Sequence, residues 1–269
     1  MEQELKLTLK NKDGEVQTED EGKGFAYLAY HREYALGDYY EITVDQVPVF
    51  LIVQLDSSIK PALIYLNKKV WRYYIPFNVQ REWPYPDNAF LGKRHYAEIR
   101  KATAEEINLK RNLAQNSHDQ REEIAQTYPH ASANAETRNE MVFFAKNAID
   151  GIVANEKHGS FPFQSWGVNQ QNNAEFTLDF GRNVVIDEVC LVLRADYPHD
   201  SYWVKVTILF SDGTKKNIYP EKTSKKQRFT FDKRTISYLK LTDLIKDKDN
   251  SNFPALSQIE VYGTEECVS

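Results

Sequence analysis

The sequence predicts an all-β protein made of two β-sandwiches joined by a short helical connector. Short apolar runs separated by turn residues fill roughly the first hundred positions, which is typical of antiparallel sheets. A polar stretch with a helix-capping signal follows, and strand-like runs then continue almost to the end. We therefore expect a first sandwich over residues 1–101, a connector over residues 102–130 and a second sandwich over residues 131–269.

The first predicted sandwich contains short runs rich in β-branched and aromatic residues. Glycine and proline interrupt these runs, for example at Asp13-Gly14 and Lys60-Pro61, where we expect the chain to turn. Many short strands divided in this way favour an antiparallel sandwich or barrel. The expected strands are Leu5–Leu9, Phe25–Tyr30, Asp38–Val44, Val49–Leu55, Ala62–Val70, Trp71–Phe77 and Arg94–Ile99.

The connector begins with a helix signal. Thr103 followed by Glu106 is a capping box, and the apolar residues Ile107, Leu109 and Leu113 lie near helical spacing. This pattern predicts one helix or two short helices between residues 102 and 126. Residues 118–126 are highly charged, so we expect them to form an exposed connector at a domain boundary.

The second predicted sandwich again shows alternating runs. Ser211-Asp212-Gly213 is a strong hairpin signal between two of them. Because neighbouring antiparallel strands alternate in direction, the aromatic and polar clusters that flank residues 174–193 should meet at one end of a sheet. The expected strands are Ala174–Phe180, Val184–Leu193, Trp203–Phe210, Lys216–Tyr219, Gln227–Phe231, Tyr238–Leu244 and Leu256–Tyr262.

Composition excludes several classes of protein. The chain has a net charge of −5 and a pI near 5.8, which disfavours nucleic-acid binding and docking on an anionic membrane. Its two cysteines, Cys190 and Cys267, indicate neither a disulfide framework nor a zinc site. We expect no membrane insertion, because no apolar run is long enough to span a bilayer. The charged N-terminus predicts a cytoplasmic protein, although a secreted or cell-surface protein without its leader would look the same.

Residues 139–263 resemble the discoidin, or coagulation factor 5/8 C-terminal-type, domains, which include the family 32 carbohydrate-binding modules. The motifs that carry the resemblance are Asn147-Ala148-Ile149-Asp150-Gly151, Gln164-Ser165-Trp166, Phe176-Thr177-Leu178-Asp179-Phe180-Gly181, Val184–Leu193, Phe210-Ser211-Asp212-Gly213 and Ser257-Gln258-Ile259-Glu260-Val261-Tyr262-Gly263. The resemblance implies a galactose-binding-like jelly-roll sandwich that holds its ligand in loops at one end, with Trp166 packed in its core. We expect the first half to be a more distant galactose-binding-like sandwich.

The resemblance also implies a structural calcium ion near Asp150. In this family the turn after the first helix or strand supplies a carboxylate and backbone carbonyls, which suit calcium. The last strand supplies a Glu, and Gln258 occupies the corresponding position here. Its amide oxygen is neutral, so this calcium site would be weaker or empty. In the alternative interpretation, Asp150 is a turn residue whose side chain bonds to the backbone.

The residues predicted to bind ligand lie in loops around the second sandwich. They are His158, Arg194, Asp196, His199, Asn252 and Phe253. Arg and Asp suit sugar hydroxyls as donor and acceptor, and an aromatic ring suits the apolar face of a pyranose. Three alternatives remain open: a solvated His158, an Arg194–Asp pair that stiffens its loop, and a Phe253 folded under its loop. His158, His199 and Asp200 match no known metal-ligand spacing.

These observations predict a non-catalytic carbohydrate-binding protein whose partner is a glycan or small sugar. One alternative is a glycan-processing enzyme with a cleft between the two domains, which would need a pair of carboxylates across that cleft. The other is an adaptor that binds a protein partner through the same loops. Neither a Gly-x-Ser-x-Gly elbow nor a phosphate-binding loop is present, so catalysis has no motif to support it.

Overall fold

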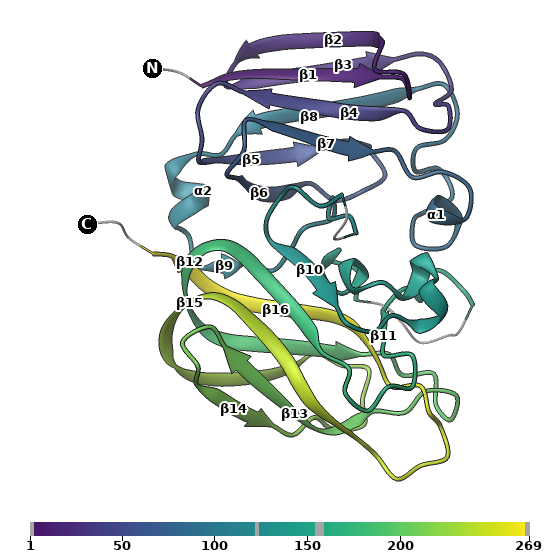
Figure 1. Cartoon of the computed structure of the whole chain (residues 1–269), viewed down its shortest axis with the longest axis vertical. Coiled ribbons are helices and arrows are strands. Elements are labelled where there is room, and N and C mark those ends of the chain that lie inside the picture. The colour runs from purple at the N-terminus through teal and green to yellow at the C-terminus, as the bar shows by residue number, and fades with distance from the viewer. Residues whose placement is uncertain (1–2, 122–123, 154–158, 267–269) are drawn as a thin grey trace.

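The computed structural model describes residues 3–121, 124–153 and 159–266 of the 269-residue chain. Figure 1 shows two β-sandwiches stacked along the long axis of the molecule, the N-terminal one above the C-terminal one. The named strands pair antiparallel throughout, so the predicted all-β fold class is confirmed. In these described ranges, no helix is long and apolar enough to span a membrane.

The first sandwich consists of two four-stranded sheets that pack face to face. Its strands are β1 (Glu4–Lys10), β2 (Val16–Lys23), β3 (Phe25–Tyr30), β4 (Tyr39–Val44), β5 (Val49–Gln54), β6 (Ala62–Leu66), β7 (Val70–Tyr74) and β8 (His95–Lys101). The sheets have the orders β2–β1–β4–β7 and β3–β8–β5–β6. Alternate residues such as Leu7, Ile42 and Ile99 point between the sheets and are fully buried there.

Strand β2 and the short helix α1 (Val79–Glu82) are absent from the sequence prediction. Strand β2 reads VQTEDEGK and lacks apolar alternation, because it is an edge strand that pairs with β1 alone. A charged edge strand opposes pairing with other molecules, which explains why its composition looks like that of a loop.

The second sandwich contains the remaining strands and three short 3₁₀ helices. The strands are β9 (Arg111–Asn112), β10 (His130–Ala133), β11 (Trp166–Gly167), β12 (Phe176–Leu193), β13 (Trp203–Phe210), β14 (Lys215–Ile218), β15 (Gln227–Lys246) and β16 (Ala255–Glu265). The 3₁₀ helices are η1 (Thr137–Asn139), η2 (Met141–Phe143) and η3 (Ala145–Ile149). The main strand order is β11–β16–β12–β15–β13–β14, with β10 paired to β12 and β9 to β16.

Two strands in this sandwich are much longer than predicted. The two runs expected before and after Gly181 form the single 18-residue strand β12, and the last two runs before β16 merge into the 20-residue strand β15. The two strands pair along both halves, with a register shift between Asp179 and Val184. Both halves contribute to one core, so the long strands curve over it, as Figure 1 shows.

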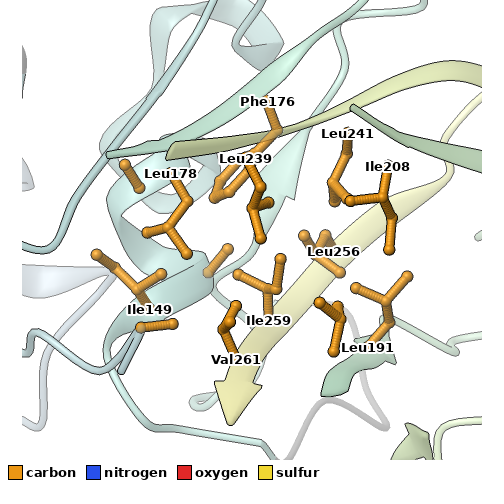
Figure 2. Close-up of a cluster of buried hydrophobic side chains, with 14 of the residues drawn as sticks. Ile149, Phe176, Leu178, Leu191, Ile208, Leu239, Leu241, Leu256, Ile259 and Val261 are labelled. Carbon is orange, nitrogen blue, oxygen red and sulfur yellow. The ribbon is translucent and has the colours of Figure 1, made fainter. Parts of the chain in front are cut away.

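That core is continuous through the second sandwich. Figure 2 shows Phe176, Leu178, Leu239 and Leu241 facing Leu191, Ile259 and Val261 across it. Trp166 also lies in this core with no exposed surface, and its Nε1 donates to the carbonyl of Ala135 at 2.9 Å. The expected core position of Trp166 is therefore present.

The connector is less helical and less exposed than the sequence predicts. Helix α2 spans only Ala104–Asn108, and its predicted capping box between Thr103 and Glu106 is present. Beyond it, the Asn112 side chain accepts from the backbone N–H groups of Ala114 and Val261, and β9 pairs with β16. These contacts draw Leu113 into the second core instead of continuing a helix.

The connector residue His118 is also buried, contrary to the expected exposed connector. Its imidazole has no exposed surface, Nε2 accepts from the backbone N–H of Leu55 at 3.0 Å, and Nδ1 lies 3.0 Å from Ser117 Oγ. The Ser117 hydroxyl in turn donates to the carbonyl of Lys60. These linked hydrogen bonds hold the connector against the first sandwich. The charged sequence of the connector could not reveal this contact.

A second set of contacts joins the sandwiches near Gly181. Tyr65 and Tyr128 exchange two backbone hydrogen bonds of 2.8 and 3.1 Å. The guanidinium of Arg182 lies over the rings of Phe50 and Tyr65, 4.8 and 4.9 Å from their centroids. The two sandwiches thus meet through packed rings and backbone pairing.

Candidate functional site

Loops at one end of the second sandwich enclose a shallow cavity of about 60 Å³, which we call the loop-end pocket. Its walls come from η1 and η2, the segment after β11, and the loops after β12 and before β16. The lining residues are Thr137, Arg138, Phe143, Gly167, Val168, Asn169, Gln170, Arg194, His199, Asn252, Phe253, Pro254 and Ala255. The structure therefore brings together four residues predicted to bind ligand: Arg194, His199, Asn252 and Phe253.

The aromatic part of the pocket is a stacked pair. The rings of His199 and Phe253 are nearly parallel, at 12°, with centroids 5.6 Å apart. Phe253 is 38% exposed and the His199 side chain 44% exposed, so Phe253 is not folded under its loop. The Ser251 hydroxyl donates to the carbonyl of His199 and accepts from the N–H of Phe253, which joins the two loops below the rings.

Arg194 forms the floor of the pocket. Its Nη2 and Nε lie 2.6 and 3.0 Å from the two carboxylate oxygens of Asp200, and both side chains are almost fully buried. Burial alone would raise the pKa of Asp200, but the hydrogen bonds and charge of Arg194 outweigh it and hold the pKa below its usual range. This geometry matches the loop-stiffening Arg–Asp pair.

Three residues that line the pocket, and one next to them in sequence, have left-handed backbone conformations. They are Arg138, Asn139, Asn169 and Gln170, with φ between 50° and 57°. Such conformations cost about 1 kcal/mol or more for residues other than glycine and persist only where the surroundings enforce them. Here Thr137 Oγ1 accepts from the N–H of Asn169, whose side chain accepts from the N–H of Arg138. Strained backbone thus presents two amides and a guanidinium at the rim.

Of the two other predicted ligand residues, only Asp196 lies in the described part of the chain, and it does not line this pocket. The side chain of Asp196 is partly buried, and its backbone N–H donates to the Asp200 carboxylate at 2.8 Å. It therefore belongs to the loop that Asp200 organises. His158 lies outside the described residues.

Sequence reasoning missed Arg138, Phe143, Asn169 and Gln170. Arg138 and Phe143 have no sequence signal, since they reach the pocket only because η1 and η2 fold against β11. Gly167 permits this approach, because a Cβ there would lie 2.5 Å from Thr137 Oγ1. The amide-rich run Asn169–Asn173 was a usable signal, since amides suit sugar hydroxyls.

Asp150 and Gln258 do come together, in a hydrogen-bonded turn. The Gln258 side-chain oxygen accepts from the N–H of Gly151 at 3.1 Å. The Asp150 carboxylate accepts from the N–H of Ile152 at 2.7 Å and from Gln164 Nε2 at 3.2 Å. Gln258 therefore lies at the turn that contains Asp150, as the family resemblance implies for the residue at its position.

The residues around this turn do not fit a calcium ion. The side-chain oxygens of Asp150 and Gln258 each accept from an N–H donor, and Lys60 Nζ donates to the carbonyl of Gly151. Among the described residues, no group of three or more Asp, Glu, Cys or His side chains is arranged so that it could hold a metal ion. Burial raises the pKa of Asp150 to about 7, against the opposing effect of its hydrogen bonds and two nearby lysines.

No protein-family model and no curated protein matches the chain. Solved structures with a similar fold include chitosan-binding module 1 from a chitosanase/glucanase of Paenibacillus sp. IK-5, with 20% identity, a TM-score of 0.40, and coverage of 56% of this chain and 98% of the module. The family 32 module of Clostridium perfringens NanJ, in complex with galactose, has 16% identity, a TM-score of 0.41, and coverage of 57% and 99%.

The lectin domain of lectinolysin, complexed with Lewis B antigen, is similar to the same degree, with 19% identity, a TM-score of 0.41, and coverage of 57% and 96%. These structures are of the kind that the sequence motifs pointed to. At identities of 20% or less and TM-scores of 0.40–0.41, these similarities say nothing about the ligand or the activity of this chain.

Proposed function

We propose that the loop-end pocket binds a neutral or weakly acidic glycan without processing it. The observation that carries this proposal is the exposed His199–Phe253 ring pair beside a rim of amide and guanidinium groups. A sugar ring has an apolar C–H face and a polar edge of hydroxyls. An aromatic shelf next to hydrogen-bond donors and acceptors suits both parts at once.

The lining residues have different roles in this proposal. Phe253 and His199 supply the stacking surface, and the exposed Asn252 and Gln170 supply hydrogen bonds to hydroxyls. Arg138 pairs with Glu140 through Nε and Nη2, and its remaining N–H groups can donate to a hydroxyl. Arg194 positions the His199 loop through Asp200, because its own guanidinium is committed to that carboxylate. The site is small, so we expect weak binding to one sugar unit, since each contact with protein replaces a contact with water.

The lining of the pocket supports binding over hydrolysis at this position. A glycoside hydrolase needs two carboxyl groups on opposite sides of the scissile bond. None of the described residues that line the pocket is Asp or Glu. Two carboxylates next to the lining are already paired: Asp200 is held by Arg194 below the surface, and Glu140 is held by Arg138.

A glycan array followed by calorimetric titration of the best sugar tests the proposal. Phe253→Ala should weaken binding by about 0.5–1.5 kcal/mol, because it removes the stacking face. The control is Tyr219→Ala, which removes an exposed ring from the same sandwich, outside the pocket lining. The proposal fails if no sugar binds, if both variants bind like the parent, or if the parent hydrolyses the bound glycan.

A further inference from the structure

A second cavity lies between the two sandwiches and is larger than the loop-end pocket. Its volume is about 390 Å³, within the range that accommodates small organic ligands. Lys60, Pro84 and Tyr85 line it from the first sandwich, and Lys146, Asp150 and Phe161 from the second. Most of the lining is apolar, and we call this space the interdomain cavity.

Lys146 is an unusual residue for such a cavity. It lies on η3, where all five residues are buried, and only 8% of its surface is exposed. Its ammonium donates to Tyr85 Oη at 3.4 Å and lies 5.0 Å from the centroid of the Tyr85 ring. Among the described residues, no Asp or Glu oxygen lies within 4.0 Å of Lys146 Nζ. Burying an ammonium group with so few partners destabilises the folded state, because little offsets the loss of its hydration.

Asp150 does not provide the missing counter-charge directly. Its carboxylate oxygens accept from the N–H of Ile152 and from Gln164 Nε2, and they form no ion pair with Lys146, although the charge of the lysine is near enough to lower the pKa of Asp150. Lys60 is exposed and donates to the carbonyl of Gly151, which places a second ammonium at the same cavity. Asp119 also lines the cavity, but its carboxylate accepts from the N–H of Ala131 and lies 2.8 Å from His130 Nδ1. Both described carboxylates of the lining are thus held by other groups, which leaves the two ammonium groups to attract an anion.

We propose that the interdomain cavity binds a small organic carboxylate with an apolar body. Its carboxylate pairs with the Lys146 ammonium and accepts a hydrogen bond from Tyr85 Oη, while its apolar part lies against Phe161 and the neighbouring proline and aliphatic side chains. The largely apolar walls disfavour strongly hydrated ions such as sulfate. This site is separate from the loop-end pocket, because the two have no described lining residue in common.

Matched acid and amide probes test the charge requirement on the full chain. The probes are benzoate, phenylacetate and indole-3-acetate, each paired with its primary amide, which has nearly the same shape without the charge. We expect at least one acid to bind, and to bind about tenfold or more tightly than its amide, because a hydrogen bond to a charged group is worth that much. If no acid binds, or if each acid and its amide bind alike, the proposal is wrong.

Variants then assign the effect to Lys146. Lys146→Met keeps an unbranched apolar side chain and should weaken acid binding to the level of the amide, while its melting temperature stays the same or rises. Tyr85→Phe, which keeps the ring below the ammonium, should weaken acid binding about threefold to tenfold. If Lys146→Met does not fold, the Tyr85→Phe variant alone still tests the proposal. Acid binding unchanged in both folded variants would contradict the proposal.

Two controls separate the interdomain cavity from other places on the chain where an acid could bind. Lys215→Met removes an exposed lysine of the second sandwich and should leave acid binding unchanged. Phe253→Ala alters the loop-end pocket and should also leave acid binding unchanged. Loss of acid binding in the Phe253 variant would place the acids in the loop-end pocket and overturn the assignment.

Discussion

Arg194 and Asp200 form a buried ion pair below the loop-end pocket, with Nη2 and Oδ1 2.6 Å apart and both residues no more than 2% exposed. Asp200 also accepts from the N–H of Asp196 and lies 3.0 Å from His199 Nδ1. One buried carboxylate therefore connects the floor of the pocket to the ring that lines its wall.

Removal of Arg194 should affect folding more than sugar binding. Arg194→Ala leaves the Asp200 carboxylate buried without its main partner, so we expect urea unfolding to show a loss of about 3–5 kcal/mol. The control Arg138→Ala removes a guanidinium that is 58% exposed and should change stability by less than about 1 kcal/mol. The double variant Arg194→Ala/Asp200→Ala should recover part of the loss. Equal effects of the two single variants would contradict this role for Arg194.

His118 should make the fold sensitive to acid. Burial lowers its pKa to about 3, whereas an unfolded histidine has a pKa near 6.5. The stability contributed by the neutral imidazole is present above pH 6.5 and is lost at about 1.4 kcal/mol per pH unit as the pH falls toward 3. Asp150 acts in the opposite direction, because its raised pKa stabilises the fold below about pH 4 and this contribution is lost as the pH rises through 7.

Two variants should therefore change the pH dependence of the free energy of unfolding in opposite directions between pH 5 and 7. His118→Gln leaves the Asp150 contribution, so its stability should rise on acidification relative to the parent. Asp150→Asn leaves the His118 contribution, so its stability should fall. Denaturant unfolding at several pH values measures both slopes, and His31→Gln, at an exposed position, serves as the control. Parallel profiles for all four proteins would rule out this account.

Gly181 is required by close contact with Tyr128. The residue has φ of +66°, and a Cβ there would lie 2.4 Å from the Tyr128 ring. Gly181→Ala should cost about 2 kcal/mol or more, because it adds a steric clash to an unfavourable backbone conformation. Gly213→Ala has a similar φ of +83° with no atom within 4 Å, so it should cost only about 1 kcal/mol. Thermal unfolding of the two variants should separate the clash from the backbone effect.

Calcium should have no effect on the second sandwich. The oxygens of Asp150 and Gln258 are already occupied by N–H donors, and Lys60 bonds to the adjacent carbonyl. We expect the same melting temperature in excess calcium and in a chelator. A calcium-dependent rise that disappears in Asp150→Asn would show instead that this turn rearranges into a metal site.

The strand alternation and loop chemistry predicted the sandwiches and placed His199, Asn252 and Phe253 at one pocket. Apolar alternation is a direct consequence of one-sided burial, so it is visible in sequence. The left-handed conformations of Arg138 and Gln170 are not visible in the same way, because neither residue type favours them. Their part in the pocket depends on contacts with segments about 30 residues away.

The burial of the connector could not be predicted from the sequence for a different reason. His118 and Asp119 have the composition of solvent-exposed residues, and only their partners make burial tolerable. Those partners are the N–H of Leu55 for His118, and for Asp119 the ring of His130 and the N–H of Ala131. Local sequence cannot show that a distant backbone N–H will satisfy a buried histidine.

A domain with its own hydrophobic core could in principle be moved to another protein as a unit. The pairing of β9 with β16, and the burial of Leu113 in the second core, set a limit on portability here. A graft that began at residue 131 would leave behind an edge strand and part of the hydrophobic interior. A graft that began before Lys110 would retain both, so the transferable unit starts about twenty residues earlier than the change in composition suggests.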